Sequence, residues 1–292
     1  MKDRYGREID YLRISITDRC NLRCIYCMPE EGICQTAHKE ILTYDEIRRI
    51  CRCMTALGIK KIKLTGGEPL TRKDSAVLVR MLKELPGIEK VTLTTNGILL
   101  KEQMAELAEA GIDNINISLD TLNTEDFQKI TRREGLARVL EGLKEAMKYP
   151  QIGLKINCVP VLEDPENLIN LAGIARDNPI HVRFIEMMPI GYGKEFRFCG
   201  EDEICSVLEG AYGEMTPITE KYGNGPCHYY KISGFQGKIG FISAMTHKFC
   251  SQCNRVRMTS EGYLKACLQY QTGESLKDMM RTGCSDEELT EA

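Results

Sequence analysis

Residues 11–27, YLRISITDRCNLRCIYC, join a strand-like run to a loop that carries three cysteines. The run YLRISIT alternates apolar and polar residues, as half-buried strands do. Cys20, Cys24 and Cys27 follow it directly in the pattern C-x3-C-x2-C. A second strand-like run, KIKLT from Lys61, also closes in a polar, glycine-rich turn, LTGGEPL. This part of the chain therefore predicts strands whose carboxyl ends lead into functional loops.

The same alternation continues to about residue 187. Further strand-like runs begin at Val91, Ile115, Leu154 and Val182. Segments with apolar residues three and four apart lie between the runs, at residues 43–58, 73–87, 100–111, 124–149 and 165–177. Six strands with five intervening helices predict an α/β fold with a parallel sheet and right-handed crossovers. Both a doubly wound open sheet and a partial (βα)6 barrel fit this count.

Composition narrows the class of protein. The chain has 292 residues, with 39 Lys and Arg against 42 Asp and Glu, for a net charge of -3. This balance argues against a broad basic surface for nucleic acid. No apolar run approaches the roughly 20 residues of a membrane span, and the N-terminus lacks a signal-peptide core. We therefore expect a soluble, cytoplasmic protein without a membrane or nucleic-acid partner.

The alternation stops near residue 195. The remainder is rich in Gly, Tyr and short strand-like runs such as HYYKISG and GKIGFIS. This change predicts a barrel in residues 1–195 and a smaller region in residues 196–292. No hydrophilic linker separates the two, so we expect the second region to pack on the barrel.

Fourteen cysteines are unexpected in such a chain. Disulfides are rare in the reducing cytosol, where clustered cysteines more often bind metal or take part in chemistry. Three thiolates in one loop suit an iron–sulfur cubane, one iron of which is then open for a ligand. Zinc would need a fourth ligand, and by residue type Cys34 or His38 could supply it.

TDRCNLRCIYCMPEEG resembles the cysteine signature of the radical S-adenosylmethionine (SAM) enzymes, and LTGGEPL resembles their glycine-rich SAM-binding loop. The resemblance implies a [4Fe-4S] cluster on Cys20, Cys24 and Cys27 whose open iron chelates SAM. Reductive cleavage of SAM would then give methionine and a 5′-deoxyadenosyl radical.

A second triplet, Cys250, Cys253 and Cys267, lies in HKFCSQCNRVRMTSEGYLKACLQY. By spacing alone a zinc ribbon is a fair alternative, and His247 is a possible fourth ligand. Arg255 and Arg257 follow the first pair of cysteines. Alternate residues of an extended segment point to the same side, so two guanidiniums could face one phosphate or carboxylate ligand.

Over nearly the full chain, the arrangement resembles the GTP 3′,8-cyclase family of molybdenum cofactor biosynthesis. The most diagnostic segments are FISAMTHKFCSQCNRVRMTSEGYLKACL and VRFIEMMPIG. The resemblance implies a partial radical SAM barrel with a second [4Fe-4S] cluster in the C-terminal region. The activity implied is the SAM-dependent cyclisation of GTP to (8S)-3′,8-cyclo-7,8-dihydroguanosine 5′-triphosphate.

The resemblance also assigns ligand contacts residue by residue. The SAM contacts implied are Tyr26, Gly67, Ser118 and Met188, with Met187 an alternative to the last. The GTP contacts implied are Arg13, Lys63, Thr94, Lys155, Arg183, Arg255, Val256 and Arg257. From residue type alone, the charged residues on the first, second and fifth strands would instead face solvent.

The eight remaining cysteines are interpreted as structural or incidental thiols: Cys34, Cys51, Cys53, Cys158, Cys199, Cys205, Cys227 and Cys284. The family implies an electron donor of flavodoxin or ferredoxin type and cyclic pyranopterin monophosphate synthase as the next enzyme. It also suggests a homodimer. Its chains usually continue into a Gly-Gly tail needed for cyclisation, whereas this sequence stops at Ala292. Either the chain is truncated or its activity differs.

Two other functions compete with GTP cyclisation. A radical SAM enzyme with an auxiliary cluster could modify another substrate, such as a peptide. A zinc-stabilised nucleotide-binding protein without catalysis would also explain the cysteines. Metal content separates the second alternative from the radical enzymes.

Overall fold

The computed structural model describes residues 2–162, 164–220, 222–270 and 272–292. Its centre is the predicted parallel sheet, in which neighbouring strands follow chain order from β1 to β6. These strands are β1 (Tyr11–Ser15), β2 (Lys61–Thr65), β3 (Lys90–Thr95), β4 (Asn114–Ser118), β5 (Gly153–Cys158) and β6 (His181–Ile185). The order never reverses, so the fold is the partial barrel rather than the doubly wound sheet, which requires a reversal.

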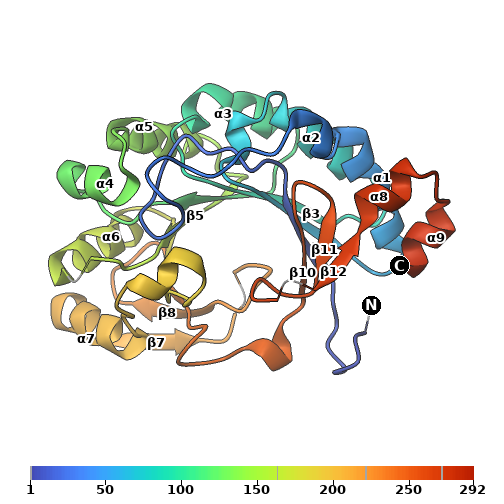
Figure 1. The fold of residues 1–292 in the computed structure, drawn as a ribbon. Coiled ribbons are helices and arrows are strands. Elements are labelled where there is room, and N and C mark those ends of the chain that lie inside the picture. The colour runs from blue at the N-terminus through green and yellow to red at the C-terminus, as the bar shows by residue number, and fades with distance from the viewer. Residues whose placement is uncertain (1, 163, 221, 271) are drawn as a thin grey trace.

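The helices between these strands lie on the outer side of the curved sheet (Figure 1). They are α1 (Tyr44–Ala56), α2 (Ser75–Lys83), α3 (Leu100–Glu109), α4 (Thr124–Thr131), α5 (Leu136–Ala146) and α6 (Pro165–Asp177). Thr43 caps α1 as predicted, in a capping box with Glu46. The apolar residues of the strands, such as Leu12 and Ile62, are fully buried.

The single helix expected over residues 124–149 is wrong. The structure has two helices there, α4 and α5. Arg132 ends α4 with a left-handed backbone (φ 54°), and Gly135 precedes α5 with φ 149°. Neither conformation belongs to a helix, and at Gly135 the absence of a Cβ permits it. The apolar spacing on both sides of the break is helical, so periodicity alone did not show it.

The C-terminal region extends the same sheet at both edges. Its elements are α7 (Glu201–Tyr212), β7 (Met215–Ile218), β8 (His228–Ile232), β9 (Ile239–Ile242), β10 (Arg255–Met258), β11 (Tyr263–Lys265), β12 (Gly273–Ser275), α8 (Leu276–Arg281) and α9 (Asp286–Glu291). β9 pairs in parallel with β6, while β10 pairs in parallel with β1. The region therefore packs on the barrel as expected, and the boundary at residue 195 stays a prediction.

The last two helices lie beside α1 (Figure 1). Arg281 of α8 forms an ion pair with Glu46 at 2.8 Å, and Arg49 of α1 pairs with Asp286 of α9 at 2.7 Å. Lys277 reaches Glu40 at 2.6 Å. Within the described residues, no helix has the length and apolar character needed to cross a membrane.

Candidate functional site

The first cysteine triplet lies in the loop that follows β1. Cys20 and Cys24 are half-buried, Cys27 is exposed, and each remains a free thiol. Burial, together with the neighbouring Cys27, raises the pKa of Cys24, and burial with the Asp120 carboxylate raises that of Cys27 to about 11. Both thiols are therefore protonated when no cation is bound, and a positive metal centre would deprotonate them. The donor set fits an iron–sulfur cluster held by thiolates.

The glycine-rich loop after β2 is packed against the start of this cysteine loop. The Gly67 N–H donates to the Thr17 carbonyl at 2.8 Å, and the Glu68 N–H donates to the Arg19 carbonyl at 2.7 Å. A Cβ at Gly67 would lie 2.3 Å from the Arg19 carbonyl oxygen. A larger residue at Gly67 would therefore separate the two loops. This packing is a reason for glycine that the sequence did not reveal.

Glu68 holds together the loops at the carboxyl ends of the strands, although it was not among the predicted site residues. Its buried carboxylate accepts hydrogen bonds from the Leu70 N–H at 2.9 Å, the Thr95 hydroxyl at 2.7 Å and the Asn96 N–H at 2.6 Å. Asn96 in turn donates to Asn21 of the cysteine loop at 2.7 Å. Three strand ends are thereby tied together, as a rigid ligand site requires.

Tyr26 is anchored by a second carboxylate. Its hydroxyl donates to Asp120 at 2.6 Å, and the Val159 N–H donates to the other Asp120 oxygen at 2.8 Å. Burial raises the pKa of Asp120 to about 6. A cavity of about 40 Å³ lies beside this pair and brings Cys24, Tyr26 and Ser118 together. Asp120 is a positioning residue whose only sequence signal was its place after the fourth strand.

The sulfur of Met187 packs toward the turn at Gly193, where an added Cβ would lie 3.0 Å from it. The same added Cβ would lie 2.6 Å from the Met188 carbonyl oxygen, and Met188 is half-buried. Both methionines therefore lie at this turn, and Met188 stays the predicted SAM contact, with Met187 as the alternative.

The second cysteine triplet lies beside the start of β10. Cys250 is exposed, while Cys253 and Cys267 are half-buried. Burial raises the pKa of Cys253, but the Arg255 guanidinium, whose Nε lies 3.5 Å from the sulfur, outweighs burial and lowers it. Both Cys253 and Cys267 act electrostatically on Arg257. Cys253 and Cys267 therefore lie next to the two arginines.

His247 has other partners in the structure. Its Nδ1 lies 3.4 Å from Glu201 and 3.2 Å from the Thr246 hydroxyl. In the described part of the chain, no three His, Cys, Asp or Glu side chains are grouped as ligands of a single metal ion. That finding concerns one ion, whereas a four-iron cluster distributes its thiolates over separate irons.

The inner face of the sheet, opposite the helices, carries a group of cations that we term the inner cation cluster. Lys63, Lys155 and Arg183 are at most 8% exposed, and Arg13 is half-buried. Burial lowers the pKa of Lys63 well below its ordinary value, and Arg183 and Arg13 lower it further. Arg255 and Arg257, on neighbouring β10, are half-buried and complete the cluster. The solvent-facing orientation expected from residue type alone is wrong for the strand lysines.

In the described part of the chain, no carboxylate offsets the positive charges of this cluster. Among the described residues, no Asp or Glu forms an ion pair with any of its members. The Nε atoms of Arg13 and Arg183 are buried without a hydrogen-bond partner there. Burying like charges without carboxylate partners costs free energy, so the arrangement is suited to a multiply charged anion. Thr94 lies nearby on β3, where its hydroxyl contacts Asn116 at 3.4 Å.

Val256 differs from its two arginine neighbours. It alternates with them on β10 and packs against the apolar core. Any contact that Val256 makes with a ligand on the inner face is therefore through its backbone.

Residues 14–173 match the Radical SAM superfamily, and residues 180–292 match Molybdenum Cofactor Synthesis C. The GTP 3′,8-cyclase of Clostridium perfringens (strain 13) is 46% identical over 100% of this chain and 90% of its own. That of Syntrophomonas wolfei is 43% identical with the same coverage. This chain belongs to the GTP 3′,8-cyclase family of radical SAM proteins. Membership implies a [4Fe-4S] cluster and SAM as cofactors.

Other members and structures extend the comparison. "Molybdenum cofactor biosynthesis protein 1" of Dictyostelium discoideum is 42% identical over 100% of this chain and 47% of its own. Streptococcus suis SuiB bound to S-adenosylmethionine has a TM-score of 0.68 at 18% identity, covering 93% of this chain and 64% of SuiB. Methylornithine synthase (PylB) has a TM-score of 0.53 at 21% identity, covering 71% of this chain and 64% of that protein. These two likenesses show the fold alone.

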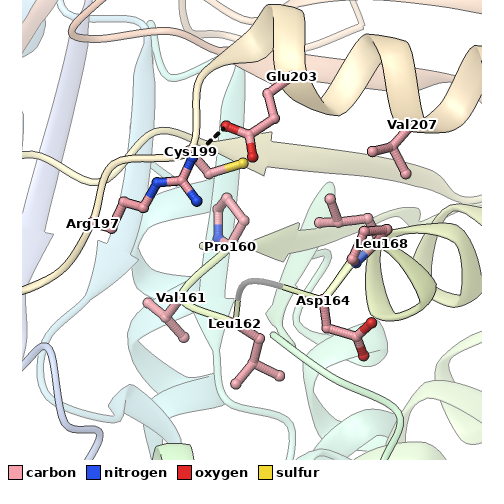
Figure 2. Close-up of a pocket in the computed structure, with 10 residues that line it drawn as sticks. Pro160, Val161, Leu162, Asp164, Leu168, Arg197, Cys199, Glu203 and Val207 are labelled. Carbon is pink, nitrogen blue, oxygen red and sulfur yellow. Dashed lines mark ion pairs between the residues drawn. The ribbon is translucent and has the colours of Figure 1, made fainter.

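A separate cavity of about 130 Å³ lies between the loop after β5 and α7 (Figure 2). Pro160, Val161 and Leu168 give it an apolar wall, and Arg197 pairs with Glu203 at 3.5 Å beside it. None of the family ligand residues lines this cavity. The predicted ligand contacts therefore lie elsewhere, at the cysteine loops and the inner cation cluster.

We predict that Lys63→Met stabilises the nucleotide-free protein by about 1–2 kcal/mol, because it replaces a buried unpaired charge with an apolar chain. The pKa of Lys63 is lower in the folded protein than in the unfolded chain. The gain should therefore shrink as the pH rises toward the unfolded pKa. Urea unfolding at neutral and alkaline pH measures it.

The matched control is Lys60→Met, which removes an exposed lysine one residue before β2. It should leave the free energy of unfolding within about 0.5 kcal/mol of wild type. Destabilisation by Lys63→Met would contradict the account of the inner cation cluster as a strained anion site.

Proposed function

We propose that this protein uses SAM to cyclise GTP to (8S)-3′,8-cyclo-7,8-dihydroguanosine 5′-triphosphate, in the biosynthesis of the molybdenum cofactor. The observation that carries the proposal is the inner cation cluster, which has no carboxylate partners in the described residues. A nucleoside triphosphate supplies the missing negative charge. Membership of the cyclase family supports guanine as the base.

The first triplet would hold the cluster that binds SAM, and that cluster supplies the reductive chemistry when present. In this proposal Tyr26, Gly67, Ser118 and Met188 position SAM at the carboxyl ends of the strands. Tyr26 is oriented by Asp120, and Ser118 shares the small cavity beside Cys24. The packed loops around Glu68 would exclude water from the proposed SAM site.

The second triplet would hold a second [4Fe-4S] cluster facing the purine of GTP. Arg255 and Arg257 lie next to its thiols, while Arg13, Lys63, Lys155 and Arg183 line the inner face. Thr94 and the backbone of Val256 complete the proposed GTP contacts. The cations would orient GTP by its phosphates, so that the ribose lies between the two cysteine triplets.

The electron donor of flavodoxin or ferredoxin type, cyclic pyranopterin monophosphate synthase as the next enzyme and a homodimer stay predictions. They are supported by family membership.

An anaerobic reconstitution tests the proposal. Iron and sulfide are counted, and then dithionite, SAM and GTP are added. The expected products are 5′-deoxyadenosine and the cyclised nucleotide. Two zinc ions without iron would favour a zinc-stabilised binding protein. SAM cleavage that is indifferent to GTP would favour a different substrate, such as a peptide.

We predict that GTP affinity falls about tenfold between pH 7 and pH 9, because Lys155 must be charged to bind the anion. Burial, with Arg183 nearby, lowers the pKa of Lys155 to about 8 in the nucleotide-free protein. The bound polyanion favours the charged form, so binding above pH 8 requires uptake of a proton. Equilibrium titrations with GTP at stepped pH measure the loss.

Lys155→Arg keeps the charge through this range and should flatten the profile relative to wild type. Lys60→Arg, at an exposed site, should not change it. Identical profiles for wild type and Lys155→Arg would show that Lys155 does not contribute this charge.

A further inference from the structure

One wall of the inner face has buried polar atoms that no other residue satisfies. In the described chain, Tyr229 Oη, His181 Nδ1 and Arg183 Nε lack hydrogen-bond partners. Tyr229 is only 2% exposed. Cys227 and Arg183 lie close enough to interact with its hydroxyl, but in a geometry too poor for a well-formed hydrogen bond. Buried polar groups are nearly always satisfied, so these orphan atoms indicate a ligand.

The His181 and Arg183 atoms come from β6 and the Tyr229 hydroxyl comes from β8, with β9 between these strands, and Lys155 of β5 lies beside them. In the sheet, Lys155 of β5 is opposite His181 of β6. A Cβ placed at Gly223 would lie 3.5 Å from Lys155 Nζ and 4.0 Å from Tyr229 Oη, so both groups reach the same small space. The His181 and Tyr229 rings meet edge to face, with centroids 5.6 Å apart.

Glycine keeps this space open. Gly240 of β9 separates Arg183 of β6 from Tyr229 of β8 in the register of the sheet. A Cβ at Gly240 would lie 2.8 Å from the Tyr229 ring. Any larger residue would therefore displace the phenol. Tyr222 packs on the same rings, 4.8 Å from His181 and 5.4 Å from Tyr229, and fixes their orientation.

Each group can donate a hydrogen bond. Burial raises the pKa of Tyr229, which stays a protonated phenol. Burial, followed by Lys155, Lys238 and Arg183, lowers the pKa of His181 to about 4, so its imidazole is neutral and can carry its proton on Nδ1. Lys155 and Arg183 add charged donors. Together these side chains can offer four donors to a phosphate group, whose oxygens accept hydrogen bonds.

We propose that Tyr229, His181 and Lys155 form a pocket for the terminal phosphate of the nucleotide and so select GTP over GDP. That the bound nucleotide is GTP rests on the proposed function. The phosphate recognition does not, because it follows from the donors alone. Neither Tyr229 nor His181 is among the GTP contacts that the family resemblance implies.

The test is equilibrium binding of GTP, GDP and inorganic tripolyphosphate to the reconstituted protein. Tyr229→Phe removes one oxygen and keeps the ring. This variant should bind GTP and tripolyphosphate about tenfold more weakly, which is the usual effect of losing one hydrogen bond to a charged group. Its affinity for GDP should fall less than twofold. His181→Phe keeps the ring contacts and should act in the same direction. Melting temperature and iron content check that each variant is folded.

Tyr230→Phe is the matched control, because it removes the same atom from the next residue of β8. The Tyr230 hydroxyl contacts Glu201 at 3.2 Å, on the other face of the strand. This variant should bind all three ligands like wild type. Equal weakening of GTP and GDP by Tyr229→Phe, or no weakening of either, would overturn the terminal-phosphate pocket.

The outcomes also separate this inference from the proposed function. If Tyr229→Phe weakens tripolyphosphate but wild type does not convert GTP, the pocket stands and the substrate assignment fails. If wild type converts GTP but the variant binds tripolyphosphate normally, the cyclisation stands and the pocket fails.

Discussion

Cys24→Ser should abolish SAM cleavage, with a loss of at least ~10³-fold, because the cofactor carries the chemistry and the cluster loses one of three ligands. Cys24 is the middle cysteine of the loop and lines the cavity with Tyr26 and Ser118. The measurement is 5′-deoxyadenosine formed under anaerobic reduction. Iron content should fall toward that of one cluster per chain.

Cys34→Ser provides the control, since this exposed thiol belongs to the same long loop but not to the triplet. It should retain wild-type iron content and SAM cleavage. A loss of activity as large as that of Cys24→Ser would indicate that Cys34 takes part in metal binding, which would revive the zinc alternative with Cys34 as the fourth ligand.

Cys267→Ser should separate the two halves of the reaction. SAM cleavage should stay within about threefold of wild type, whereas GTP conversion should fall at least ~10²-fold, because substrate orientation contributes strongly to rate. Cys267 follows β11, and its thiol acts on Arg257 rather than on the first triplet. The two products, 5′-deoxyadenosine and cyclised nucleotide, are quantified in one reaction.

The comparison variant here is Cys284→Ser, a half-buried thiol between α8 and α9. It should preserve both products. If Cys267→Ser and Cys24→Ser lost SAM cleavage equally, the division of labour between the two triplets would be wrong.

Much of the fold could be predicted because the local patterns agree with the global one. The strand alternation and the helix at residues 165–177 follow directly from periodicity, and Thr43 caps its helix as expected. The break between α4 and α5 could not be predicted in this way, because it depends on backbone conformations at Arg132 and Gly135. The strand pairings of β9 and β10 join residues far apart in sequence, which no local pattern specifies.

The candidate site likewise has residues that the sequence predicted and residues that only the fold revealed. The cysteine triplets and the arginine pair are local in sequence, so spacing revealed them. Asp120 and Glu68 became positioning residues only when the fold brought the ends of β1, β3 and β5 to them. The inward orientation of Lys63 and Lys155 depends on which face of the sheet the helices cover, and residue type alone favoured the opposite orientation.

The two cysteine triplets and the βα repeat of residues 11–187 indicated a metal-binding chemistry and the fold class, because ligand type and periodicity are properties of the chain itself. The tertiary structure decided what surrounds that chemistry. It buried cations against one another without carboxylate partners in the described residues, and it left Tyr229 and His181 with unsatisfied atoms on the same wall. Burial and the lack of partners are relations between distant residues, so only the folded chain could reveal the demand for a polyanion.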